Sequence, residues 1–110
     1  MATFIVIGYG DQQGYEQTDS SVRDAAHAHD AQLKARGATM GMAGAPVQVR
    51  NHNAAGMHTT EGPFMRSELP VAGFMVIEAD NAEEAAKLAS GVPCAVNQGV
   101  VEVWPLDTSR

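Results

Sequence analysis

The sequence predicts a single α+β domain, residues 1–110, with a ferredoxin-like sheet that carries an inserted β-hairpin. Two long apolar runs, at 2–9 and 70–79, have the β-branched and aromatic content of strands. Each run is followed by a segment with helix start and stop signals, and a polar hairpin pattern lies between the two halves. The order β-α-β, hairpin, β-α-β is the split βαβ pattern, in which two helices cover one face of a sheet.

The first half of the chain predicts two strands with a helix between them. In order, the expected elements are a strand at 2–9, a polar loop from Gly10 to about Thr18, a helix at about 20–36 and a strand at 38–43. Ser21 and Asp24 have the spacing of a capping box near the start of the helix. Gly37 follows two basic residues and marks the end of the helix.

The second half predicts a hairpin followed by a strand, a helix and a last strand. In order, these are strands at 47–50 and about 56–60 joined by a turn at 51–53, a strand at 70–79, a helix at about 81–90 and a strand at 100–104. Asp80 or Asn81 is the expected cap of this helix, and Gly91 and Pro93 are expected to end it. Pro105 stops the last strand because it has no N–H to donate.

The strands are apolar on both faces. Residues 4–7 and 71–77 contain continuous apolar runs, whereas a sheet with one wet face alternates apolar and polar side chains. Something is therefore expected to cover the face opposite the helices. We expect a second copy of the same sheet in a homodimer, and the alternative is that the hairpin folds over that face.

Composition excludes several classes of function. The net charge of −6 and the scattered lysines and arginines argue against nucleic-acid binding. The single Cys94 cannot form an internal disulfide, so nothing indicates an oxidising compartment. No targeting segment is visible and the first apolar run is too short to span a bilayer, so we expect a cytoplasmic protein that does not bind membranes.

The segment Glu61-Gly62-Pro63-Phe64 resembles the "DGPF" signature of the YCII-related family, with glutamate in place of the usual aspartate. The likeness covers nearly the whole chain, and it includes Tyr9-Gly10-Asp11, Gly73-Phe74, the Glu84-Ala85 helix, Pro93 and Val101–Pro105. The resemblance implies a dimeric α/β-barrel protein with a cleft beside the sheet. It also implies a histidine–carboxylate pair as the place to look for an active site. Trp104 departs from the family pattern, because members usually carry arginine there.

Three residues are candidates for acid–base chemistry. His29 shares a helix face with Ala26 and Leu33 and should point toward the sheet, where a neutral imidazole acts as a general acid or base near pH 7. The alternative is a core histidine satisfied by a backbone carbonyl. Glu61 is expected either to assist His29 or to hold the Gly-Pro turn. Glu102 is expected either in a wet cleft or on an edge-strand surface.

Four aromatic residues are the candidate ligand-binding residues: Tyr9, Phe64, Phe74 and Trp104. Tyr9 offers a hydroxyl at the end of the first strand, with packing as its alternative role. We expect no metal site, because His27 and His29 diverge on their helix and the other histidines lack partner acids or cysteines. We expect no cofactor either, since the glycines after the first strand do not fit a dinucleotide loop.

Two functions from different classes therefore remain open, beside a third reading as a purely structural dimer without a pocket. The first is a cofactor-independent enzyme of the isomerase or lyase type that binds a small organic molecule in a cleft, with His29 and a carboxylate transferring protons. The second is a non-catalytic ligand-binding or regulatory interaction module. An enzyme should place His29 and a carboxylate within hydrogen-bond reach in an accessible pocket, whereas a binding module needs only an apolar pocket.

Overall fold

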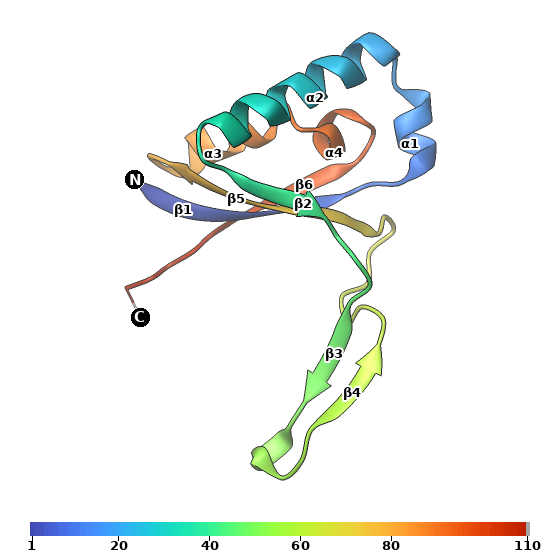
Figure 1. The fold of residues 1–110 in the computed structure, drawn as a ribbon, viewed down its shortest axis with the longest axis vertical. Coiled ribbons are helices and arrows are strands. Elements are labelled where there is room, and N and C mark those ends of the chain that lie inside the picture. Colours follow the sequence, from blue (N-terminus) through green and yellow to red (C-terminus); the bar gives the residue numbers. More distant parts are fainter. Residues whose placement is uncertain (110) are drawn as a thin grey trace.

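The computed structural model describes residues 1–109 and shows a four-stranded antiparallel sheet with helices on one face only (Figure 1). The strand order is β2-β5-β1-β6. The strands of this sheet are β1 (Ala2–Tyr9), β2 (Thr39–Met42), β5 (Val71–Ala79) and β6 (Val100–Pro105). This order, with β1 and β5 in the centre, confirms the predicted ferredoxin-like arrangement.

The hydrophobic core lies between this sheet and the helices. Alternate residues of the two central strands face the helices and are buried, among them Phe4 and Val6 of β1 and Met75 and Ile77 of β5. The helices add small side chains and Leu33 to this cluster. Because side chains alternate between the faces of a strand, the other residues of β1 and β5 are left on the face without helices.

The two long helices form close to where the sequence predicts them. They are α2 (Ser20–Ala35) and α3 (Ala82–Ala89). Asn81 is the N-cap of α3, and its side chain accepts a hydrogen bond from Glu84 N at 2.9 Å. The predicted capping box at Ser21 was wrong: Asp19 occupies the N-cap position of α2 without a side-chain cap bond, and Ser21 lies inside the first turn.

Two short helices were not predicted, α1 (Gln12–Gln17) and α4 (Pro93–Val96). The first lies in the segment expected to be a loop, and its Asp11 cap accepts a hydrogen bond from Gly14 N at 2.9 Å. In α4, Pro93 occupies the start of the helix, where its missing N–H costs nothing. The sequence interpretation used Pro93 only as a stop for the preceding helix, and so missed the one that it begins.

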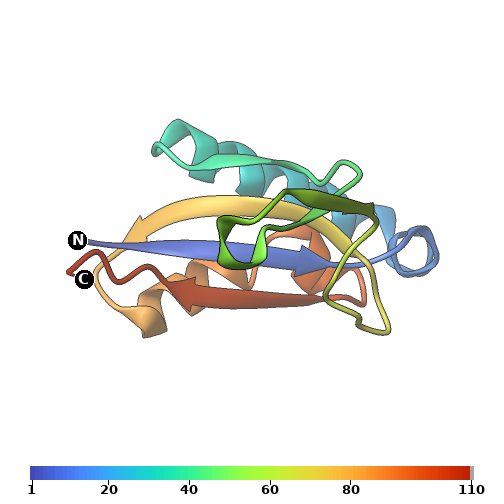
Figure 2. The same cartoon turned by 90° about the horizontal axis from the view of Figure 1, so that it is seen from below.

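The predicted hairpin forms an arm that stands away from the sheet. It consists of β3 (Val47–Arg50), the 3-10 turn η1 (His52–Ala54) and β4 (His58–Glu61), and these two strands make a separate sheet. We call residues 47–61 the arm. It extends from the side of the sheet opposite the helices (Figure 1), and the view from below shows it beneath the central strands (Figure 2).

The arm does not fold onto its own sheet, which rules out the alternative covering of the open face within one chain. Phe74, Val76 and Trp104 on that face are 50%, 38% and 55% exposed. The base of the arm is closed by a 3.1 Å hydrogen bond from Gly62 N to Pro46 O. Gly62 has φ +94°, a value that glycine reaches without strain, so the glycine of the Gly-Pro pair shapes this turn as expected.

Two glycines allow α4 to pack closely against the end of the sheet. A Cβ atom at Gly99 would lie 2.5 Å from Cys94 O and would also collide with Tyr9 O. A Cβ at Gly8 would lie 2.8 Å from Cys94 Sγ. The absence of side chains at these two positions therefore lets the α4 segment lie directly against the end of β1.

We expect Gly99→Ala to destabilise the protein by about 2–3 kcal/mol, because the new methyl group must displace backbone on two sides. Gly44→Ala is the matched control, since its Cβ would meet nothing within 4 Å and its φ is not positive. Urea unfolding followed by circular dichroism gives the free energy of unfolding of both variants. Equal stability of the two variants would contradict the close approach at Gly99.

Candidate functional site

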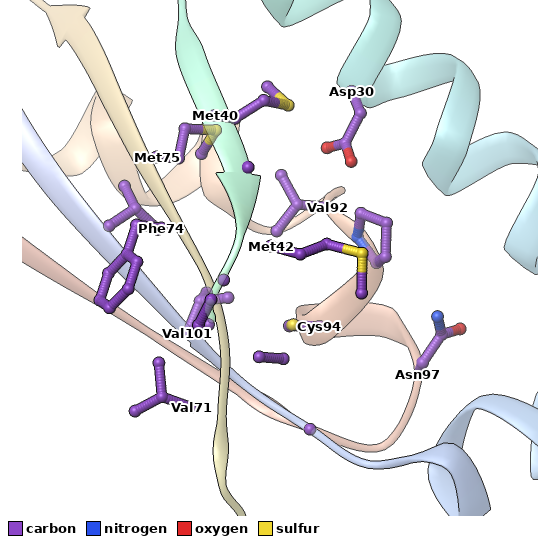
Figure 3. A pocket seen from close by; sticks show the side chains of 18 of the residues that line it. Asp30, Met40, Met42, Val71, Phe74, Met75, Val92, Cys94, Asn97 and Val101 are labelled. Atoms are coloured by element: carbon purple, nitrogen blue, oxygen red, sulfur yellow. The ribbon is translucent and has the colours of Figure 1, made fainter. Parts of the chain in front are cut away.

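A pocket of about 640 Å³ lies between the sheet and α2. It lies on the helix-covered side, with β1, β2 and β5 as its floor and α2 and the α4 segment as its walls (Figure 3). A volume of this size falls in the range of pockets that hold small organic ligands. We call it the helix–sheet pocket.

Two glycines leave the floor of the helix–sheet pocket bare. Gly8 of β1 and Gly73 of β5 are direct partners in the central pair of strands. On either side of this pair, Met42 is the partner of Gly73 and Val101 is the partner of Gly8. The row across the sheet therefore has side chains at its ends and none in its middle, which creates the depression.

Asp30 and Cys94 enter the helix–sheet pocket from opposite elements, α2 and α4 (Figure 3). Burial raises the pKa of the Asp30 carboxyl, although the nearby His27, His29 and Lys34 act in the opposite direction. Burial also raises the pKa of the Cys94 thiol, and the negative charge of Asp30 raises it further. The two groups are therefore electrostatic neighbours in one partly dehydrated space.

Two acceptor atoms of the helix–sheet pocket residues have no hydrogen-bond partner among the described residues 1–109. They are Oδ1 of Asp30 and Oδ1 of Asn97, both without contact to solvent. Asn97 is only 7% exposed. A buried acceptor without a partner costs about 1–3 kcal/mol, so a side-chain rotation that brings either oxygen to a donor on a bound molecule would recover free energy.

The mouth of the helix–sheet pocket combines one apolar side chain with charged groups. Met42, on the edge strand β2, is 93% exposed and extends toward α4 (Figure 3). His27 and Lys34 belong to the lining on α2, one turn before and one turn after Asp30. A flexible thioether at the rim adapts to apolar ligands of different shape.

His29 lies outside the helix–sheet pocket. Its Nε2 donates a hydrogen bond to the Leu88 carbonyl oxygen at 2.6 Å, and its ring packs against Gly91, where a Cβ would lie 2.9 Å from the ring. This contact ties α2 to the segment after α3. Neither Glu61 nor Glu102 is a hydrogen-bond partner of His29, so one chain does not assemble the histidine–carboxylate pair that the sequence predicts.

Glu102, Tyr9 and Trp104 form a polar cluster on the open face of the sheet. The Tyr9 hydroxyl donates a hydrogen bond to Glu102 Oε1 at 2.6 Å, and Trp104 Nε1 donates to the same oxygen at 3.5 Å. The bond to Glu102 raises the pKa of Tyr9, with burial as a smaller cause, because the carboxylate holds the phenolic proton. Phe74 belongs to the same face, two strands away from Glu102, with Ile7 between them.

Glu61 and Phe64 lie at the base of the arm. Both are exposed, and the Arg50 guanidinium lies 5.8 Å from the centroid of the Phe64 ring. The structure therefore brings Tyr9, Glu102, Trp104 and Phe74 onto one face. It places His29 on the helix side, and Glu61 and Phe64 on the arm side.

The sequence matches the YCII-related domain over residues 2–107. The chain belongs to the YCII-related family. This match covers nearly the whole chain and confirms the resemblance seen around Glu61-Gly62-Pro63-Phe64. A search of curated proteins found no match.

Two further properties of the YCII-related chain follow from its described part, residues 1–109. None of its helices there combines the length and apolar character needed to cross a membrane. In the same range, no three side chains of histidine, cysteine, aspartate or glutamate gather into a group suited to a metal ion.

Of the site residues predicted from the sequence of this YCII-related chain, Phe74 alone borders the helix–sheet pocket among the described residues, and the polar lining was missed. Neither Asp30 nor Cys94 was among the predicted site residues. One signal was present: Gly8 and Gly73 interrupt the two most apolar strands of the chain. A glycine inside a strand often marks a place where a ligand or another backbone approaches closely.

We expect Asp30→Asn to speed the alkylation of Cys94 several-fold near pH 8. Loss of the negative charge lowers the pKa of the thiol, and the thiolate is the reactive form. Reaction with iodoacetamide, followed by mass spectrometry over a range of pH, measures the rate at this single cysteine. Asp24→Asn on the exposed side of α2 is the control and should leave the rate unchanged. An equal rate in the wild type and both variants would show that the charge of Asp30 does not influence the Cys94 thiol.

Proposed function

We propose that this YCII-related protein binds a small organic molecule in the helix–sheet pocket. The observation that carries the proposal is the Asp30 carboxylate, which has a buried, unpartnered oxygen at the wall of a pocket with a bare glycine floor. An unpaired acceptor in a mostly apolar cavity is the arrangement expected of a site that holds a polar group of a ligand.

The chemistry of the pocket defines the class of ligand. A flat apolar body fits against the strand backbone at Gly8 and Gly73, and a hydroxyl or N–H group satisfies Asp30. Asn97 adds a second acceptor for longer ligands. Binding of this kind needs no cofactor.

An acid–base activity at the same site is the second candidate. It is favoured by the raised pKa of Asp30, because a carboxylate in a dehydrated pocket is a stronger proton acceptor than one in water. In this version Asp30 removes a proton from the bound hydroxyl or from a carbon acid such as an enolisable ketone. His29 then has a positioning role, since its Nε2 proton is engaged by the Leu88 carbonyl and holds α2 in place.

We also propose that two copies pair through their open sheet faces. Ile5, Ile7, Phe74, Val76 and Trp104 form the apolar part of this face. Stacked sheets pack about 10 Å apart with their side chains interdigitated, and an isologous pair buries the same patch on both chains. The support is the exposure of this face, which the arm leaves uncovered.

Ligand binding is tested with aryl alcohols such as 2-naphthol and their methyl ethers, which keep the apolar body but lose the donor. We expect the alcohol to bind at least about tenfold more tightly, the ratio of one good hydrogen bond to a charged acceptor. Amide shifts in ¹⁵N-labelled protein should change at Gly8 and Gly73, and binding should slow the alkylation of Cys94.

The matched variants for this experiment are Asp30→Ala and Asp24→Ala. The first should abolish the preference for the alcohol, and the second should retain it. Shift changes confined to the open face, around Glu102 and Trp104, would place the ligand elsewhere and refute binding in the helix–sheet pocket.

Pairing is tested by sedimentation velocity and by the emission of Trp104, the only tryptophan. We expect a dimer with blue-shifted emission, and we expect Val76→Lys to give a monomer because the charge would be buried against apolar side chains. Val22→Lys places the same change on the surface of α2 and should leave the dimer intact. The measurement is made at 100 μM, which is roughly a hundredfold above a micromolar dissociation constant. A wild-type monomer at this concentration would refute the pairing of the sheets.

A further inference from the structure

The arm lacks the support that a two-stranded sheet needs. An isolated hairpin is at best marginally stable in water, and it gains stability by packing against another surface. No residue of the arm is buried, and none belongs to the hydrophobic core. Within residues 1–109, the hydrogen bond from Gln48 to Gly62 O and the contact of Arg50 with Phe64 join the arm to the rest of its chain near its base. We therefore expect the order of the arm to depend on a surface outside the chain.

The two faces of the arm differ. On one face, Gln48 donates a hydrogen bond to Gly62 O at 3.1 Å, and Arg50 donates to Gln48 Oε1 at 2.8 Å and lies over Phe64. The other face carries Val47 and Val49, which are 57% and 62% exposed. Their cross-strand partners are Glu61 and Thr59. This face, which we call the valine face, therefore carries two ordered and exposed valines with Thr59 and Glu61 beside them.

The direction in which the arm extends indicates which surface its valine face contacts. It leaves the body on the open side of the sheet (Figure 1), and the view from below shows it beneath the central strands (Figure 2). In the sheet pairing proposed above, the second sheet lies about 10 Å away on this side. An arm that extends in this direction can then reach along the partner's sheet.

Most of the large exposed apolar side chains among residues 1–109 lie in two places, on the arm with its base and on the open face. One group lies on the arm and its base: Val47, Val49, Met57, Phe64 and Met65. The other lies on the open face: Phe74, Val76, Val100 and Trp104. The arm, with one arginine and one glutamate, carries no net charge, whereas the whole chain carries −6. Contact between an arm and a second body therefore meets less repulsion than contact between two bodies.

We propose that each arm embraces a second copy of the chain, with the valine face of Val47 and Val49 buried against the partner's sheet. The proposal rests on the pairing of sheets proposed above and adds a second contact to it. In this assembly the arm is a clamp: two arms, exchanged reciprocally about the two-fold axis, cover the flanks of the paired sheets.

The test is the dimer dissociation constant of Val47→Thr/Val49→Thr in the full-length chain. Threonine keeps the β-branched shape and the strand propensity but exposes a hydroxyl, so the arm itself should persist while its contact weakens. We expect the dissociation constant, measured by sedimentation equilibrium, to rise at least tenfold. Val22→Thr makes the same substitution on α2 and should leave it unchanged.

Hydrogen exchange gives a second readout that does not depend on a substitution. Amides of residues 47–50 and 58–61 should exchange slowly in the dimer and rapidly after dilution to the monomer, whereas amides of β1 should stay protected in both. A wild-type monomer would refute the sheet pairing as well as the clamp. A wild-type dimer that keeps its affinity in the double variant, or whose arm amides exchange rapidly, would refute the clamp alone.

Discussion

The close approach of backbone at three glycines is the constraint on which the rest of this structure depends. Gly8, Gly14 and Gly99 each lie where a Cβ would collide with the α4 segment or with the strand beside it. Without side chains there, the turn from α4 into β6 lies directly on the end of β1. This seating fixes the wall of the helix–sheet pocket at Cys94 and Asn97. The β6 strand that follows has Glu102 as the partner of Ile7 and within reach of the Tyr9 hydroxyl.

Neighbouring residues of β1 contribute to the sites on opposite faces of the sheet. Gly8 contributes to the pocket floor on the helix side, and Tyr9 holds Glu102 on the open side. Because both belong to one strand, a shift of β1 along its axis would disturb the pocket and the polar cluster together. The sheet is therefore a shared structural element between the two proposed contacts, the ligand and the second copy.

The fold was predictable because its main signals are local and strong. Apolar runs gave β1 and β5, and Asn81 and Gly37 marked helix ends. The two short helices were not predicted, because six or four residues are too few to show a helical pattern of apolar side chains. Pro93 was also ambiguous, since a proline can end one helix or begin the next.

The site was predicted less well. The pairing of Tyr9, Glu102 and Trp104 follows from strand alternation, but the position of His29 depends on which way α2 leans. The contacts of His29 with Leu88 and Gly91 are with residues about 60 positions away in sequence, so no local pattern identifies these partners.

The hydrogen bond that closes the base of the arm has a consequence for how this chain tolerates change in length. Pro46 and Gly62 meet there, so the fifteen positions between them enter and leave the body at nearly one point. Closing a loop depends only weakly on how many residues it holds, about 0.6 kcal/mol for each doubling. Residues gained or lost in this segment would alter the reach of the arm while the sheet, the core and the pocket keep their shape. The junction at Pro46 and Gly62 is therefore the natural place for insertion, deletion or the grafting of a different hairpin.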